Sequence, residues 1–166
     1  YTSVGLMPVL LANNENHVLY DRLYAEVKES DYIKTDKNSP KVTVIVPTYN
    51  AADTIRTTIK SLLSQTYQCF EIIAVDDCSK DATVKILEEF VKLDSRLKLI
   101  KLKTNQGPYA ARNHALKIAS GDFITCHDAD DWSHPQRLAL QVQHLIENPD
   151  IVANISQWAR MMNDLH

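Results

Sequence analysis

The chain has 166 residues, of which 45% are hydrophobic and 23% charged, so it can bury the core of one compact domain and does not resemble a disordered segment. Its 18 Lys and Arg residues against 21 Asp and Glu residues give a formal net charge of −3, which excludes the basic field that nucleic acid or an anionic membrane requires. The three cysteines form no Cys-x-x-Cys pair, which argues against a disulfide framework or thiolate zinc site and favours a reducing compartment.

The first 40 residues differ in pattern from the rest of the chain. Apolar residues recur at helical spacing between Val18 and Val27, which predicts a helix. Residues 34–40 lose this periodicity and end at Pro40, which indicates a linker. We therefore expect a helical appendage over residues 1–40 and the main domain over residues 41–166.

The sequence shows no membrane-spanning or targeting segment. No apolar run approaches the ~20 residues that cross a bilayer. The first eight residues also lack the basic and then apolar layout of a signal peptide. We expect the protein in the cytoplasm or at the cytoplasmic face of a membrane.

From Lys41 onward, apolar strands alternate with amphipathic helices. Strands are predicted at residues 42–46, 70–75, 97–102, from 123, and from 151 to about 158, with Pro47 ending the first of them. Helices are predicted at residues 52–65, 83–91 and 135–148, and a further one is marked by Ala111, Ala115 and Ile118. Gly121 is expected to stop this last helix by adopting the left-handed conformation. This alternation predicts a Rossmann-like α/β sandwich of three layers with a mainly parallel central sheet.

Polar side chains gather directly after three of the predicted strands: Thr48, Tyr49 and Asn50; Asp76 and Asp77; and Asp128, Asp130 and Asp131. In parallel α/β sheets, ligands bind at the carboxyl ends of the strands. Three carboxylates this close repel one another, so a divalent cation explains the last group. Oxygen ligands favour Mg²⁺ or Mn²⁺.

Four motifs follow one another along the chain: Val-Ile-Val-Pro-Thr-Tyr-Asn50, Ala-Val-Asp-Asp-Cys-Ser79, Gly107-Pro-Tyr-Ala-Ala-Arg-Asn113 and Asp128-Ala-Asp-Asp-Trp132. Together they resemble the family 2 glycosyltransferases of GT-A fold, over roughly residues 41 to 160. The resemblance implies transfer of a sugar, with inversion, from a nucleotide diphosphate donor, commonly a UDP-sugar, to a glycan or other hydroxyl acceptor. It also implies Mn²⁺ or Mg²⁺ at an Asp-x-Asp motif, and a role in polysaccharide biosynthesis.

The resemblance assigns the metal to the acidic cluster. Asp130 is expected to be the main protein ligand, and Asp128 to bind the metal or lie near the ribose of the donor. Asp131 is expected to lie behind them, or to cap the helix that begins near Pro135. A cation there would bridge the carboxylates to the donor diphosphate, which they would otherwise repel.

The resemblance places the nucleoside at the ends of the first two strands. Asp77 matches the position that binds the nucleobase, while Tyr49 would lie against the base and Pro47 and Thr48 would line the same end. Two alternatives remain open, namely that Asp77 caps a loop and that Tyr49 belongs to the core. Asp76 could equally satisfy the backbone of that loop.

The segment from Gly107 opens a helix whose N-terminus favours an anion, so Gly107 and Arg112 are further candidates for donor binding. Arg112 could contact the donor phosphates, or it could pair with an Asp of the acidic cluster. Cys126 and His127 have no partners at zinc spacing, and we expect both to pack in or near the core.

An inverting transfer needs a general base, which in this family lies well downstream of the Asp-x-Asp motif. We expect that base beyond His166, which makes this chain the donor-binding part of a longer enzyme. A sheet cut short in this way would expose an edge that could form a homodimer.

Three other readings fit parts of the pattern. A nucleotidyltransferase of related fold would carry a glycine-rich loop after the first strand, and this chain has none there. A phosphatase with an Asp-x-Asp nucleophile would carry that motif on the first strand. The chain could also be a binding module without catalytic activity.

Overall fold

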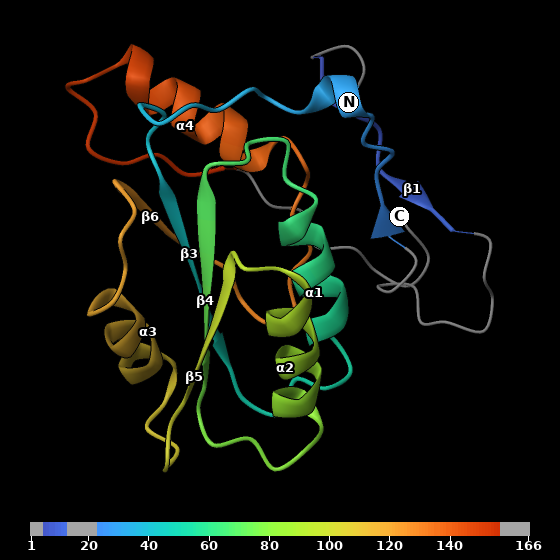
Figure 1. The fold of residues 1–166 in the computed structure, drawn as a ribbon, viewed down its shortest axis with the longest axis vertical. Coiled ribbons are helices and arrows are strands. Elements are labelled where there is room, and N and C mark those ends of the chain that lie inside the picture. Colours follow the sequence, from blue (N-terminus) through green and yellow to red (C-terminus); the bar gives the residue numbers. More distant parts are fainter. Residues whose placement is uncertain (1–4, 13–22, 157–166) are drawn as a thin grey trace.

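Four parallel strands form the centre of the molecule, in the order β5-β4-β3-β6 (Figure 1). The structure is a computed structural model that describes residues 5–12 and 23–156. The strands of this sheet are β3 (Val42–Thr48), β4 (Phe70–Asp76), β5 (Leu97–Lys101) and β6 (Phe123–Cys126). The helices between and after them are α1 (Ile55–Leu63), α2 (Thr83–Leu93), α3 (Pro108–Leu116) and α4 (Arg137–Glu147).

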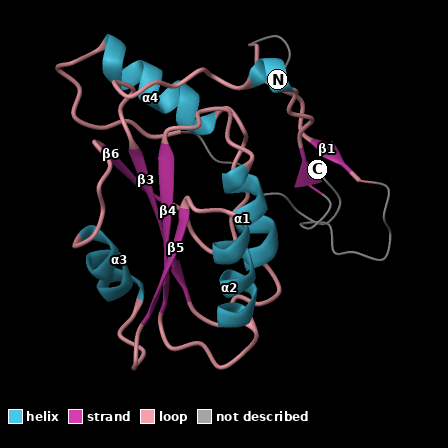
Figure 2. Cartoon of the chain, in the orientation of Figure 1, coloured by secondary structure: helices cyan, strands magenta, loops and turns pink. Residues whose placement is uncertain are grey.

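Helices cover both faces of the sheet (Figure 2). On one face, Ile45, Ile73 and Val75 pack against Ala111 and Ala115 of α3. On the other face, the strands share a larger buried cluster with α1, α2 and α4, which includes Val44, Val46, Ile72, Ile59, Leu87 and Leu138. Residues that alternate along each strand therefore serve opposite faces, as the pleat requires. The predicted three-layer α/β sandwich is confirmed.

Strand β3 runs through Pro47 to Thr48, so the prediction that Pro47 ends this strand is wrong. Alternate residues of a strand bond to opposite neighbours. The carbonyl of Ile45 accepts from the N–H of His127, beside β6, and that of Thr48 accepts from Asp77, after β4. The missing N–H of Pro47 therefore faces the β6 side, where β6 has already ended at Cys126.

Position 121 requires glycine because a larger residue would not fit there. Gly121 does not stop a helix, since α3 already ends at Leu116. It is absent from the glycines with positive φ, so the predicted left-handed conformation is wrong. A Cβ atom at Gly121 would lie 2.5 Å from the backbone nitrogen of Thr43. The N–H of Gly121 donates to the Thr43 hydroxyl at 2.9 Å, which fixes this close approach at the start of β3.

The N-terminal segment contains a short antiparallel pair, β1 (Leu10–Leu11) with β2 (Leu23–Tyr24), followed by a 3₁₀ turn, η3 (Glu29–Asp31). The helix predicted between Val18 and Val27 is therefore wrong from residue 23 onward, and its first part lies outside the described residues. Pairing with β1 outweighs the helical spacing of apolar residues here. Further on, Ile33 bridges to Tyr67 beside the main sheet.

The last predicted strand is also wrong over residues 151–156, which adopt no strand, while its end lies outside the described residues. Val152 is 98% exposed and Ile155 96% exposed. An apolar run needs a neighbouring edge to become a strand, and residues 151–156 pair with none.

Candidate functional site

The acidic cluster begins where the pairing of β6 ends. The N–H of His127 donates to the carbonyl of Ile45 at 2.9 Å, and the chain then leaves the sheet. A turn follows, in which the N–H of Asp131 donates to the carbonyl of Asp128 at 3.2 Å. Asp128 and Asp130 are exposed on this turn. We call residues 128–136 the acidic loop.

The backbone of the acidic loop is fixed against α1. The hydroxyls of Thr54 and Thr58 donate to the carbonyl of Ala129 at 2.9 and 2.8 Å. Nε2 of His127 lies 3.2 Å from the carbonyl oxygen of Asp131, which can only accept, so Nε2 carries the proton. Burial, together with the positive charge of Arg137, lowers the pKa of His127 to about 3, so this ring is neutral near pH 7. His127 is buried as predicted, whereas Cys126 is exposed and the prediction for it is wrong.

The electrostatics of the acidic loop favour a cation. Burial raises the pKa of Asp131, and the negative charges of Asp130 and Asp128 raise it further, while Arg137 opposes them. Within residues 5–12 and 23–156, no three His, Cys, Asp or Glu side chains are grouped so that they could hold a metal ion by themselves. A cation here would take one or two carboxylates and complete its shell with ligand oxygens or water, which is how Mg²⁺ binds at phosphate sites.

The side chain of Arg112 extends from α3 to this loop. Its Nη2 donates to Oδ1 of Asp128 at 2.8 Å, and its guanidinium carbon lies 5.6 Å from the ring centre of Tyr109. Its Nε is buried without a hydrogen-bond partner among the described residues. Of the two alternatives, the structure shows the pairing with an Asp of the cluster. Because Nε is buried, an anion would be contacted by the Nη N–H groups that do not bond to Asp128.

Asp77 ties the end of β4 to the start of α3. Its Oδ1 accepts from the N–H of Gln106 at 2.8 Å, and its Oδ2 accepts from the N–H of Gly107 at 2.7 Å. Gly107 has φ of 86°, a conformation that glycine adopts at little cost, and it is the N-cap residue of α3. Asp77 thus performs the loop-capping role given above as an alternative. A contact with a nucleobase remains a prediction that would use its remaining lone pairs.

Asp76 and Tyr49 offer groups that the protein leaves available. Oδ2 of Asp76 accepts from the N–H of Ser79 at 3.1 Å, but its buried Oδ1 has no partner among the described residues. Tyr49 is 50% exposed, so the alternative that it belongs to the core is wrong. Both lie beside Thr48, which is paired in register with Asp76 across the strand ends.

Two residues beside these strand ends have backbones in the left-handed region, Asn50 with φ of 47° and Cys78 with φ of 66°. Asn50 joins the two loops, since its N–H donates to the Ser79 hydroxyl and its Oδ1 accepts from the N–H of Lys80. Such conformations are uncommon outside glycine and tend to occur at functional sites. Neither residue was assigned a role from the sequence, although an Asn directly after a strand is a usable signal.

Comparisons with known proteins agree with this geometry. The model of glycosyl transferase family 2 matches residues 43–164. The chain belongs to glycosyl transferase family 2.

Relatives and solved structures show the same likeness. The chain is 41% identical over 108 residues to the putative teichuronic acid biosynthesis glycosyltransferase TuaG of Bacillus subtilis. The matched region covers 65% of this chain and 43% of TuaG. It is similar to S. aureus TarS in complex with UDP-GlcNAc, with 38% identity, a TM-score of 0.62, and coverage of 66% of this chain and 32% of TarS.

A third likeness is to the mannosyltransferase PcManGT of Pyrobaculum calidifontis in complex with GDP-Man and Mn²⁺. The identity is 32%, the TM-score 0.61, and coverage 66% of this chain and 33% of that one. The match to TarS confirms the predicted GT-A, Rossmann-like fold. This family 2 chain spans less than half the length of TuaG and about a third of the two solved chains.

A buried glutamine that the sequence analysis missed holds the acidic loop of this family 2 chain in place. Gln65 is completely buried just beyond α1. Its Nε2 donates to the carbonyl of His134 at 2.8 Å and to the hydroxyl of Ser133 at 3.1 Å, and its Oε1 accepts from the N–H of Leu138 at 3.0 Å. Gln65 thus fixes the end of the acidic loop and the start of α4. A polar residue after an amphipathic helix gives no signal of this in the sequence.

The N-terminal segment supports the acidic loop from outside. The N–H of Met7 donates to Oε1 of Gln136 at 2.7 Å, and Nε2 of His134 lies 2.9 Å from the carbonyl oxygen of Met7.

In the part of the chain that the structure describes, no helix is long and apolar enough to cross a membrane.

Proposed function

We propose that this chain is the donor-binding part of an inverting glycosyltransferase that transfers a sugar from a nucleotide diphosphate donor, a UDP-sugar, to a hydroxyl of a glycan acceptor. The arrangement of three parallel strand ends carries this proposal. Thr48 and Asp76 lie in register, Asp77 follows them, and the acidic loop leaves β6 on the other side of β3. Parallel α/β sheets bind nucleotides at this end.

The nucleoside is assigned to the β3 and β4 side of the site. The exposed ring of Tyr49 would lie against the base with the buried Pro47 and Thr48 behind it, and Oδ1 of Asp76, which has no partner among the described residues, would be an acceptor beside Asp77. TarS in complex with UDP-GlcNAc supports a nucleotide-sugar donor. PcManGT in complex with GDP-Man supports the same class of donor with a different base.

The diphosphate is assigned to the acidic loop side, between Arg112 and the carboxylates. Asp128 and Asp130 would hold Mn²⁺ or Mg²⁺, beside Asp131, whose pKa is raised by burial and then by the negative charges of Asp130 and Asp128. A bound cation would neutralise the diphosphate that leaves during transfer. Gly107 and Arg112 would approach the phosphates from the N-terminal end of α3.

Calorimetry with UDP tests this proposal. We expect UDP to bind in the presence of Mn²⁺ and to lose at least tenfold in affinity when the metal is omitted or when Asp130 is changed to Ala. Asp150→Ala serves as the matched control, because Asp150 is an exposed Asp after α4 and outside the acidic loop. Binding of UDP with equal strength in the presence and absence of Mn²⁺ would contradict the role of the metal. Absence of any UDP or GDP binding would contradict the donor site itself.

A further inference from the structure

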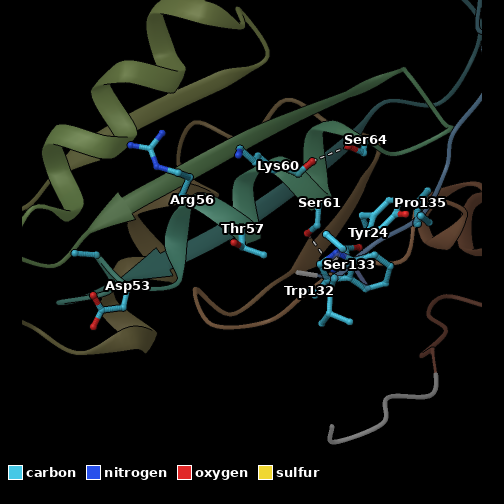
Figure 3. A pocket seen from close by; sticks show the side chains of 14 residues that line it. Tyr24, Asp53, Arg56, Thr57, Lys60, Ser61, Ser64, Trp132, Ser133 and Pro135 are labelled. Carbon is cyan, nitrogen blue, oxygen red and sulfur yellow. Dashed lines mark hydrogen bonds between the residues drawn. The ribbon is translucent and has the colours of Figure 1, made fainter. Parts of the chain in front are cut away.

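A cavity of about 600 Å³ lies on the solvent side of α1, where the N-terminal segment faces the acidic loop. Tyr24 of β2 and Trp132 of the acidic loop stand at one end, and Arg56 and Lys60 of α1 extend along it (Figure 3). None of these four residues belongs to the donor site assigned above. The cavity has the size of a site for a small organic ligand.

The walls of this cavity are rich in hydrogen-bonding groups. The hydroxyls of Ser61 and Ser64 donate to carbonyls of their own helix, each at 2.8 Å, which leaves the lone pairs of Ser64 as acceptors. Arg56 and Lys60 lie one turn apart on α1 and supply donors. One nitrogen of Arg56 is taken by Glu89 at 2.8 Å, which leaves its other N–H groups available.

The aromatic residues add flat, partly exposed surfaces to these polar walls. Tyr24 is 40% exposed. The ring of Trp132 stands edge to face against His134, with 6.1 Å between ring centres and an interplanar angle of 85°, which fixes its orientation. Aromatic rings with polar tips bind ligands that are apolar on one face and polar at the edge.

This combination matches a carbohydrate better than other ligands. A sugar ring offers C–H groups on its faces and hydroxyls around its edge, which suit aromatic rings and mixed donors and acceptors. A lipid would need a continuous apolar wall, whereas serine and charged side chains interrupt this one. A purely anionic ligand would meet Asp53, which also lines the cavity beside Arg56 and Lys60.

We propose that this cavity binds a short oligosaccharide, namely a stretch of the acceptor glycan away from its reacting hydroxyl. The proposal rests on the proposed function, which supplies a glycan acceptor. Trp132 directly follows Asp131 in the chain, so a glycan in the cavity would contact the loop that carries the proposed metal ligands. The N-terminal segment thereby acquires a role in acceptor binding through Tyr24.

Ligand-observed NMR with a panel of trisaccharides tests the proposal, using chitotriose, cellotriose, maltotriose and trigalacturonic acid with the full chain. We expect at least one to bind, and Tyr24→Ala to weaken that binding at least tenfold. Tyr32→Ala is the matched control, because Tyr32 belongs to the same N-terminal segment, is 39% exposed and does not line the cavity. A second pair, Lys60→Ala with Lys92→Ala as control, provides the same comparison on exposed helix positions should Tyr24→Ala not fold.

The outcomes separate this proposal from the proposed function. If UDP binds with Mn²⁺ but no trisaccharide does, the glycan site is wrong and the donor site stands. If a trisaccharide binds equally well to Tyr24→Ala and Lys60→Ala, it binds elsewhere and the proposal is overturned. If UDP displaces the trisaccharide in competition, the cavity is not a separate site. If a trisaccharide binds to the unchanged chain but not to these variants, and UDP does not bind, the glycan site is supported and the proposed donor site is wrong.

Discussion

Oδ2 of Asp77 accepts a hydrogen bond of 2.7 Å from the N–H of Gly107, across 30 residues of sequence. The Asp77 side chain thereby sets where α3 begins, and α3 carries Arg112 to the acidic loop. The two halves of the proposed donor site are therefore coupled through this carboxylate.

Replacing Asp77 by Asn tests this coupling. The amide places an NH₂ group against one of two backbone N–H donors, so we expect the free energy of unfolding to fall by about 2 kcal/mol and UDP affinity to fall about tenfold. Asp94→Asn is the matched control, because Asp94 also accepts from a backbone N–H, that of Arg96, but lies after α2 outside the proposed donor site, so it should leave UDP affinity unchanged. Urea unfolding and calorimetry measure the two effects, and unchanged stability of Asp77→Asn would contradict the coupling.

Gln65 offers a second test of how the acidic loop is held. Gln65→Met keeps the approximate volume but leaves the N–H of Leu138 without its partner, and it removes one of the two hydrogen bonds that the carbonyl of His134 accepts, the other coming from the N–H of Arg137. We expect a loss of about 3 kcal/mol in unfolding free energy, because the N–H of Leu138 stays buried and the bond to Ser133 is lost as well. Gln143→Met is the control, since Gln143 lies on the exposed face of α4 and bonds only to Glu147 among the described residues.

A variant of Gln65 should also weaken the metal-dependent part of UDP binding more than the metal-independent part. Among the described residues, the Gln65 side chain bonds to the end of the acidic loop, to Leu138 of α4 and to Ser61 of α1, and not to the β4 strand end. Calorimetry of UDP with and without Mn²⁺ separates the two parts. Equal weakening of both would indicate a general loss of structure.

Glu71 gives a pH-dependent prediction at the opposite end of the sheet. Its side chain is 3% exposed and receives hydrogen bonds from Lys98, Thr43 and Ser120. Burial alone would raise the pKa of Glu71, but these hydrogen bonds outweigh it and hold the pKa far below its ordinary value.

Because the folded-state pKa is lowered, the stabilisation by Glu71 is complete above the unfolded-state pKa of ~4.3 and is lost as the pH falls below it. Glu71→Gln should therefore lower the unfolding free energy by about 2 kcal/mol at pH 7, and by progressively less towards pH 2. Urea unfolding at several pH values measures this. Glu88→Gln, at an ion pair that is about half exposed, should change stability little at any pH.

Cys78 provides a stabilising substitution. Its backbone has φ of 66°, which costs a non-glycine residue about 1 kcal/mol or more. Cys78→Gly should raise the thermal midpoint, while Cys78→Ala keeps the strained backbone and loses the sulfur contacts with Lys80 and Lys103, so it should not. A rise of equal size in both variants would show that strain is not the cause.

The sequence predicted what depends on local pattern. Buried strands and amphipathic helices carry their own periodicity, so the helices and the four parallel strands between residues 42 and 147 form where expected. The strand-end rule placed Thr48, Asp77 and Asp128 at one edge. The two-residue strand β2 could not be predicted in this way, because it exists only through pairing with β1, where Leu23 is opposite Leu11. The partners of Asp77 and Gln65 are likewise set by loop paths 30 and 69 residues away along the chain.

The proline in the middle of the sheet determines where the acidic loop can start. Had position 47 an N–H, the ladder between β3 and β6 could continue past His127, and the residues after it would alternate between the two faces of the sheet. In this register an N–H at position 47 would donate to the carbonyl of His127, so the ladder ends there, and two residues later the carbonyl of Ala129 accepts from the hydroxyls of Thr54 and Thr58. Because Pro47 has no amide hydrogen, Asp128 and Asp130 do not follow the alternation of a strand, and both carboxylates lie on one exposed turn.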